Sequence, residues 1–186
     1  MNKKITYIKF FAGVSGNTVK KLMQSVEEEL KEKIEQFVIL ISSSGGDVSA
    51  GISGYNFLKG IPAEVSTHNF GDTDSVAVVL FCAGTKRYCV PHARFLLHGV
   101  AFNIIANTKF DEHALDEHIK RIKLDRETIA SIIADATKGR KKFKDVDKDI
   151  LKNTVLNSKE SIDYGLTHEI KTDLFPKDAK VISITN

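Results

Sequence analysis

The chain has 186 residues, of which 42% are hydrophobic and 27% are charged. These proportions fit a globular domain with one core and exclude a disordered or fibrous protein. The formal net charge is only +3, and the basic stretches at residues 120–126 and 138–148 are interleaved with acids. This pattern predicts solvated helix faces and argues against a nucleic-acid-binding surface.

The first half of the chain alternates between predicted strands and helices. Residues 5–12 are rich in β-branched and aromatic side chains, and Lys9 interrupts them, so they predict a strand instead of a signal peptide. In residues 18–34 apolar side chains recur every three or four positions, as on one face of a helix. Residues 37–41 form a continuous apolar run, typical of a strand buried on both faces.

The next predicted elements continue this alternation. They are a helix, a strand, a short apolar helix and two strands, at residues 48–58, 63–68, 75–83, 87–90 and 94–98. The apolar run VAVVLFCAG is far shorter than the ~18 residues that span a bilayer, so we expect a soluble cytoplasmic protein. Cys82 and Cys89 are interpreted as buried thiols. The pattern predicts an α/β fold with helices packed on a largely parallel sheet.

The second half begins with a long helical pattern at residues 110–136, which exceeds the length of a crossover connection. An amphipathic stretch at 147–151 precedes a helix at 159–164, for which Gly165 is the expected C-terminal cap. Short strands are predicted at 166–170 and 181–185. Without an internal repeat or a linker, residues 1–186 are expected to form a single domain.

Three segments join unusual backbone demands to reactive side chains: SSSGGDVSAG at 42–51, GDTDSVAVVLFCAG at 71–84 and PHARFLLHGV at 91–100. Paired glycines between a strand and a helix allow a tight turn whose N–H groups suit an oxyanion. The alternative is that the pair makes only a turn.

Ser75 and His98 are the candidate nucleophile and base. Ser75 precedes an apolar helix, whose dipole would stabilise a negative charge there. The alternative is that Ser75, Asp74 or Asp72 merely caps the helix. His98 ends an apolar strand, where an imidazole could act as a base at neutral pH. The other histidines are expected at surface or packing positions: His68, His92, His113, His118 and His168.

These segments, in this order, resemble the Clp protease proteolytic subunit and its smaller relatives. A fourth segment, VLNSKESIDYGLTHEI at 155–170, resembles the end of the same family. The resemblance implies a crotonase-like fold of repeated β-β-α units with a protruding long helix, the handle, at residues 110–136. It also implies a serine endopeptidase that acts on short or unfolded polypeptides and needs no cofactor or metal.

The resemblance assigns roles to individual residues. Ser75 is expected to attack the scissile carbonyl and His98 to take its proton, while the N–H groups of Gly46 and Val76 form the oxyanion hole. The substrate is expected to bind as an added strand beside Gly45 and Gly46.

The third member of the triad departs from the family pattern. The position of the family's aspartate falls on Asn153, with Asp149, one helical turn earlier, as the substitute. An amide can orient a histidine but cannot compensate its charge, and an Asp to Asn change in a Ser-His-Asp protease lowers turnover by about four orders of magnitude.

The family also implies partners. We expect a homo-oligomeric ring, typically heptameric and stacked in pairs through the handle, with no nucleic-acid or membrane partner. Because the chain begins almost directly with its first strand, coupling to an unfolding ATPase is doubtful. Two other functions stay open: a catalytically weak scaffold or regulatory subunit assembling in rings, and an acyl-coenzyme A enzyme.

Overall fold

The structure, a computed structural model, describes residues 3–101 and 109–186. Its eight strands form one sheet with the order β6-β5-β3-β2-β1-β8, while β4 pairs with β3 and β7. The strands are β1 (Ile5–Phe11), β2 (Gln36–Ser43), β3 (Glu64–Asp74), β4 (Lys86–Cys89), β5 (Arg94–Leu97), β6 (Thr154–Asn157), β7 (Glu169–Ile170) and β8 (Val181–Thr185). The helices are α1 (Gly16–Lys31), α2 (Val48–Gly60), α3 (Ala77–Cys82), α4 (Glu112–Ala136), α5 (Phe143–Leu151) and α6 (Ser158–Tyr164).

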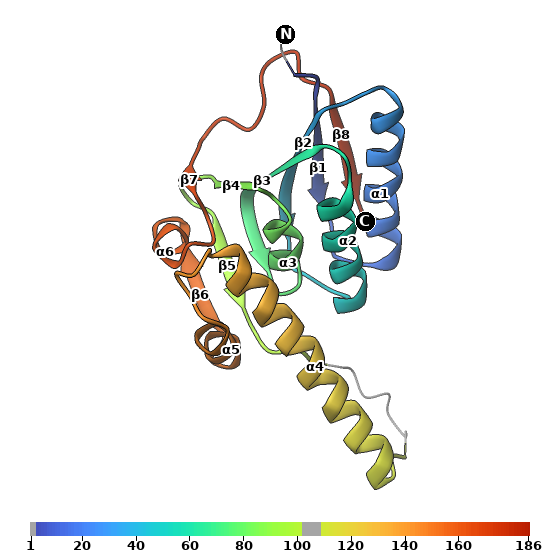
Figure 1. Cartoon of the computed structure of the whole chain (residues 1–186), viewed down its shortest axis with the longest axis vertical. Coiled ribbons are helices and arrows are strands. Elements are labelled where there is room, and N and C mark those ends of the chain that lie inside the picture. Colours follow the sequence, from blue (N-terminus) through green and yellow to red (C-terminus); the bar gives the residue numbers. More distant parts are fainter. Residues whose placement is uncertain (1–2, 102–108) are drawn as a thin grey trace.

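The predicted α/β layering is confirmed. All strand pairs are parallel except β5 with β6. Helices α1, α2 and α3 lie side by side on one face of the sheet (Figure 1). On β1, Ile8 and Phe10 are buried, whereas the alternate residue Phe11 is exposed. The face opposite the helices is therefore partly open to solvent.

Strand β3 changes its neighbour halfway along its length. Its first half pairs with β4, up to Asn69 opposite Cys89, and its last residues pair with β5, from Asp72 opposite Arg94. Asn69 spans the change, because its side chain donates to the Arg94 carbonyl at 2.9 Å and accepts from the Gly71 amide at 3.0 Å. This exchange brings the end of β3 alongside β5.

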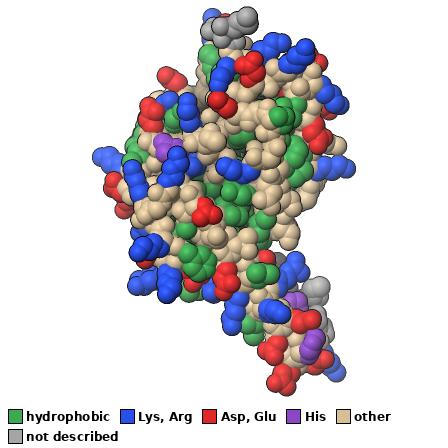
Figure 2. Space-filling view, viewed as in Figure 1, with side chains coloured by type: hydrophobic (Ala, Val, Ile, Leu, Met, Phe, Trp, Pro, Cys, Tyr) green, Lys and Arg blue, Asp and Glu red, His purple; other side chains and the backbone are tan. Residues whose placement is uncertain are grey.

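The handle is helix α4, which protrudes from the body of the protein (Figure 1). Asp111 caps its first turn by accepting from the Ala114 amide at 2.8 Å. Charged and histidine side chains gather along it, with apolar ones between them (Figure 2). The exposed apolar residues of α4 are Leu115, Ile119 and Leu124. No helix within residues 3–101 and 109–186 is long and apolar enough to cross a membrane.

The structure differs from the sequence expectations in both halves. The strand predicted at 63–68 continues to Asp74, so that the helix predicted from residue 75 begins only at Ala77. Strand β6 was not predicted, because only Leu156 of its four residues is buried and the pattern is too short to show alternation. The strand predicted at 166–170 is reduced to Glu169 and Ile170. Gly165 is confirmed as the cap of α6, with a φ of 87°.

Buried Arg87 joins the two halves of the molecule. Its guanidinium donates to the carbonyls of Leu166 at 2.6 Å, Ala136 at 2.6 Å and Gly84 at 3.1 Å. Ala136 is the last residue of α4, and the other two carbonyls follow the ends of α6 and α3, so one side chain joins the segments where three helices end.

We predict that Arg87→Gln lowers the free energy of unfolding by about 3 kcal/mol or more, because several buried carbonyls lose their donor. Urea denaturation followed by circular dichroism measures this change. The matched control is Arg126→Gln, which removes a largely buried ion pair with Asp147 but leaves no backbone carbonyl without a donor, and it is expected to cost less than Arg87→Gln. Equal losses in the two variants would contradict the role given to Arg87.

Candidate active site

Ser75 sits in a strained turn between β3 and α3. Its φ is 59°, a left-handed conformation that costs a non-glycine residue about 1–2 kcal/mol. The turn is fixed by the Ser75 amide, which donates to the Leu96 carbonyl at 2.8 Å, and by the Val78 amide, which donates to the Ser75 carbonyl at 3.0 Å. Strain of this kind is typical of functional positions.

The alternative interpretation of Ser75 as a helix cap is wrong. The N-cap of α3 is Val76, and no side chain caps it. Neither Ser75, Asp74 nor Asp72 therefore occupies the capping position, because β3 continues to Asp74 and the chain needs Ser75 for the turn.

The glycine pair packs against Ser75 and Val14 more closely than residues with a Cβ could. A Cβ on Gly45 would lie 2.6 Å from the Cβ of Ser75, and one on Gly46 would lie 2.1 Å from the Val14 carbonyl oxygen. Both glycines have positive φ, at 85° and 146°. The loop is held by Val14, whose amide donates to the Gly45 carbonyl and whose carbonyl accepts from the Asp47 amide.

The two expected oxyanion donors flank the nucleophile. Val76 follows Ser75 directly, and Gly46 follows the glycine that touches it. Within the part of the chain that the structure describes, neither amide donates a backbone hydrogen bond, whereas the neighbouring Gly45 carbonyl and Asp47 amide are both used. An N–H group without such a partner is available to a developing oxyanion.

His98 follows β5, two residues after the Leu96 carbonyl that holds Ser75. Its Nδ1 lies 2.8 Å from the Gly99 carbonyl oxygen. Because a carbonyl only accepts, Nδ1 carries the proton in this contact, and the lone pair is on Nε2. A general base at Nε2 needs this tautomer. No hydrogen bond joins Ser75 to His98 among the described residues, and such bonds are often long before substrate binds.

The two candidates for the third position lie in different settings. Asn153 is exposed in the turn before β6, with a φ of 54°. Because Leu97 pairs with Thr154 and the two strands are antiparallel, the next position on each strand brings Asn153 opposite His98. Asp149 lies on α5, where its carboxylate accepts from the Tyr164 hydroxyl at 2.9 Å and pairs with Lys141 at 3.6 Å. The Asp149 carboxylate is thus occupied by Tyr164 of α6 and by Lys141, which precedes α5.

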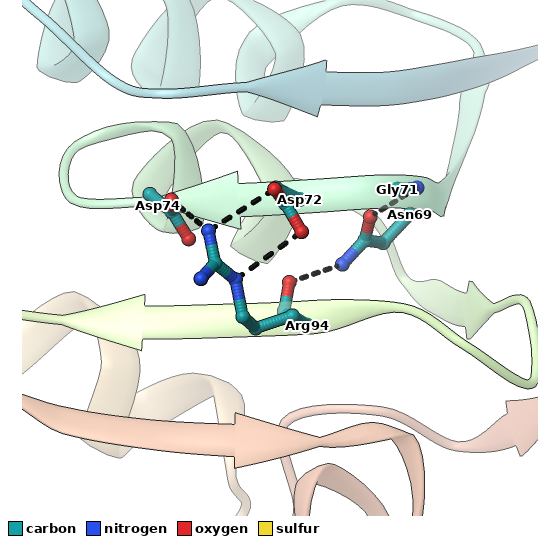
Figure 3. Close-up of polar contacts among 5 residues, drawn as sticks. All are labelled: Asn69, Gly71, Asp72, Asp74 and Arg94. Carbon is teal, nitrogen blue, oxygen red and sulfur yellow. Dashed lines mark hydrogen bonds and ion pairs between the residues drawn. The ribbon is translucent and has the colours of Figure 1, made fainter.

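A charged cluster that the sequence analysis did not assign lies beside Ser75. Arg94 of β5 reaches two carboxylates of β3, Asp72 at 3.0 Å and Asp74 at 3.1 Å (Figure 3). Burial raises the pKa of the Asp74 carboxyl above its ordinary value and Asp72 adds to this, while Arg94, His98 and the Leu96 amide oppose it. The sequence did carry a signal for this cluster: residues two or four apart on a strand share a face, as Asp72 and Asp74 do, and as Arg94 and His98 do.

A cavity of about 340 Å³ opens between the glycine loop and the handle. Its walls come from residues 46–49, from Val100 and Ala101, and from α4 residues that include His118 and Arg121.

Cys82, at the end of α3, is buried, which raises the pKa of its thiol to about 12 and keeps it protonated at neutral pH. The described residues contain no cluster of histidine, cysteine and acidic side chains suited to a metal ion.

We predict that Gly45→Ala lowers the free energy of unfolding by about 2–4 kcal/mol, through the left-handed backbone and the clash with Ser75. Gly60→Ala, at the end of α2 with open space around it, is the control and is expected to be neutral or slightly stabilising. Thermal and urea unfolding of both variants measure the difference. A Gly45→Ala protein as stable as the Gly60→Ala protein would contradict the close packing of the loop on Ser75.

The chain is similar in sequence to proteins of one known family. A family model described as Clp protease matches residues 8–173. Two curated relatives are both called ATP-dependent Clp protease proteolytic subunit 2. The one from Thermobifida fusca is 27% identical over 170 residues, covering 82% of this chain and 79% of the relative. The one from Treponema denticola is 30% identical over 166 residues, covering 80% and 79%.

A solved structure supports the same fold. An asparagine-to-aspartate mutant of ClpP1 from Listeria monocytogenes matches with a TM-score of 0.80 and 22% identity, covering 90% of this chain and 91% of that one. The predicted crotonase-like α/β fold with a protruding long helix is therefore confirmed.

Proposed function

This chain belongs to the Clp protease family, and from that premise we propose that it is a serine-type endopeptidase cleaving short or unfolded polypeptides. The observation that carries the proposal is the strained Ser75, which touches the glycine loop and donates to the Leu96 carbonyl of β5, two residues before His98. A strained turn in contact with a glycine loop positions a side chain for attack at little entropic cost during the reaction.

The first half of the proposed reaction acylates Ser75. Nε2 of His98 takes the hydroxyl proton while Oγ bonds to the scissile carbonyl carbon. The carbonyl oxygen becomes an oxyanion, which the N–H groups of Gly46 and Val76 stabilise. The C–N bond then breaks, the amine leaves with the proton from His98, and the acyl group remains on Ser75.

The second half releases the product. His98 takes a proton from a water molecule, whose oxygen attacks the acyl carbon. The C–O bond to Ser75 breaks, and the proton returns to Oγ through Nε2. The reaction consumes one water molecule and requires no metal, cofactor or nucleotide.

The substrate is proposed to lie as an extended strand beside Gly45 and Gly46. The cavity between this loop and α4 then accepts a substrate side chain next to the scissile bond. Its walls include both a cation, Arg121, and carboxylates, Asp47 and Asp125, so the cavity does not favour one sign of charge.

We also propose that the chain assembles into homo-oligomeric rings, with the handle between stacked rings. The apolar residues exposed on α4 support this, because a solvent-exposed helix would normally carry polar side chains there. Leu124, which is 61% exposed, is the most exposed of them.

A fluorophosphonate tests the nucleophile directly. We expect intact-mass spectrometry to show one phosphonyl group on the wild-type protein, formed as Oγ displaces fluoride, and none on Ser75→Ala or His98→Ala. Circular dichroism of both variants confirms that they fold. Wild-type protein that assembles into rings without being labelled would reject the peptidase and favour the scaffold function.

Replacing Asn153 by aspartate tests the third position. A carboxylate at the level of His98 would stabilise the imidazolium formed during acylation, so Asn153→Asp is expected to raise peptide turnover by about tenfold or more. Asn157→Asp, four residues along and engaged in capping α6, is the control. Turnover unchanged in Asn153→Asp would remove Asn153 from the proposed triad.

A further inference from the structure

Charged and titratable side chains share one face of the sheet next to the candidate nucleophile. Phe95 packs against Phe81 of α3 with ring centroids 5.0 Å apart, so odd-numbered residues of β5 face the helices. Arg94 and Leu96 therefore face the opposite side, and continuation of the strand places His98 there too. The register partner of Leu96 is Asp74. Asp74 and His98 thus occupy neighbouring positions on the same face.

The Asp74 carboxylate is buried and only half satisfied. The residue is 8% exposed, and its Oδ2 accepts from Arg94 at 3.1 Å. Its Oδ1 is buried and accepts no hydrogen bond from any described residue. The Leu96 amide lies near enough to the carboxyl to lower its pKa as a donor, but its geometry does not satisfy Oδ1. A buried oxygen in this state costs stability unless another group uses it.

Arg94 and its two carboxylates leave one negative charge uncompensated. Arg94 is shared between Asp72 and Asp74, so the three residues together carry one net negative charge. The adjacent strand β6 contributes only neutral side chains opposite them, Asn157 and Val155, and Asn153 follows the same register. Besides Arg94 and Asp72, the titratable group among the described residues that acts electrostatically on Asp74 is His98, which favours its charged form.

We propose that Asp74 is a positioning residue, whose carboxylate stabilises the His98 imidazolium during acyl transfer. The inference rests on the proposed roles of Ser75 and His98. The two tasks of a triad aspartate are then performed by different groups. The Gly99 carbonyl orients the imidazole by accepting from Nδ1, and Asp74 supplies the negative charge that Asn153 lacks. His98 returns to its neutral form when the proton passes to the leaving amine, so no net charge is consumed.

The first test follows the carboxyl of Asp74 itself by carbon-13 NMR. His98 lowers the pKa of Asp74 electrostatically, so His98→Gln is expected to raise the midpoint of the Asp74 titration. His92→Gln, which changes an exposed histidine in the turn before β5, is the control and is expected to leave the midpoint unchanged. An identical Asp74 titration in wild type and His98→Gln overturns the proposal, whatever the activity.

The second test measures the rate of fluorophosphonate labelling. Asp74→Asn is expected to slow labelling by about tenfold or more at neutral pH. The matched control is Asp72→Asn, which removes the same charge beside the same arginine but at a more exposed position, and is expected to slow labelling less than about threefold. Equal labelling rates in wild type and Asp74→Asn would also overturn the proposal.

Stability separates a functional role from a structural one. Because burial raises the pKa of Asp74 in the folded protein, ionising it costs stability as the pH rises through that pKa. Asp74→Asn is therefore expected to unfold at the same or a higher urea concentration than wild type at pH 7.5, with the difference vanishing in acid. A variant that is slower and clearly less stable would mean that Asp74 serves the fold instead.

The third test measures the effect of Asp74→Asn on the labelling rate in a protein that also carries Asn153→Asp. If Asp74 supplies the missing charge, Asp74→Asn should slow labelling much less once residue 153 is an aspartate. A penalty of the same size in both backgrounds contradicts the shared role. Wild-type protein that is not labelled, but whose Asp74 titration responds to His98→Gln, would reject the peptidase and leave the charge pair standing.

Discussion

The exchange of β4 for β5 beside β3 is the constraint on which the rest of the site depends. Parallel strands that stayed paired along their full length would keep β5 away from the end of β3. The exchange, spanned by the Asn69 amide, allows the Ser75 amide to reach the Leu96 carbonyl. His98 follows two residues later. One backbone hydrogen bond therefore fixes the nucleophile relative to β5, so that Ser75 and His98 follow directly on the ends of two paired strands.

The same short segment carries several features that lower stability. Ser75 has a left-handed backbone, Asp74 is a buried carboxylate, and the Thr73 hydroxyl is buried without a hydrogen-bond partner in the described part of the chain. Three consecutive residues that work against the fold contrast with Arg87, whose buried charge is satisfied by several carbonyls. Such concentration is expected where selection has favoured function over stability.

Sequence patterns predicted most of the fold, because apolar periodicity reports burial and glycines report special backbone conformations. They located the glycine loop, Ser75 and His98 as candidates. They could not place Asp74, since an aspartate before a helix is most often a cap and only the sheet register shows that β3 continues through it. Strand β6, and hence the level of Asn153, was also out of reach, because its pairing with β5 is a long-range contact.

The location of the charge partner has a mechanical consequence. Asn153 lies in a turn that follows α5, and α5 packs on the handle, so its position depends on a helix that extends out of the body. Asp74 lies on the strand that ends at Ser75 and is tied by Arg94 to the strand that leads to His98. A charge carried by Asp74 therefore keeps its position relative to both Ser75 and His98. The electrostatic environment of His98 would then be set within the central sheet of the chain, whereas contacts made by the handle would affect the position of Asn153.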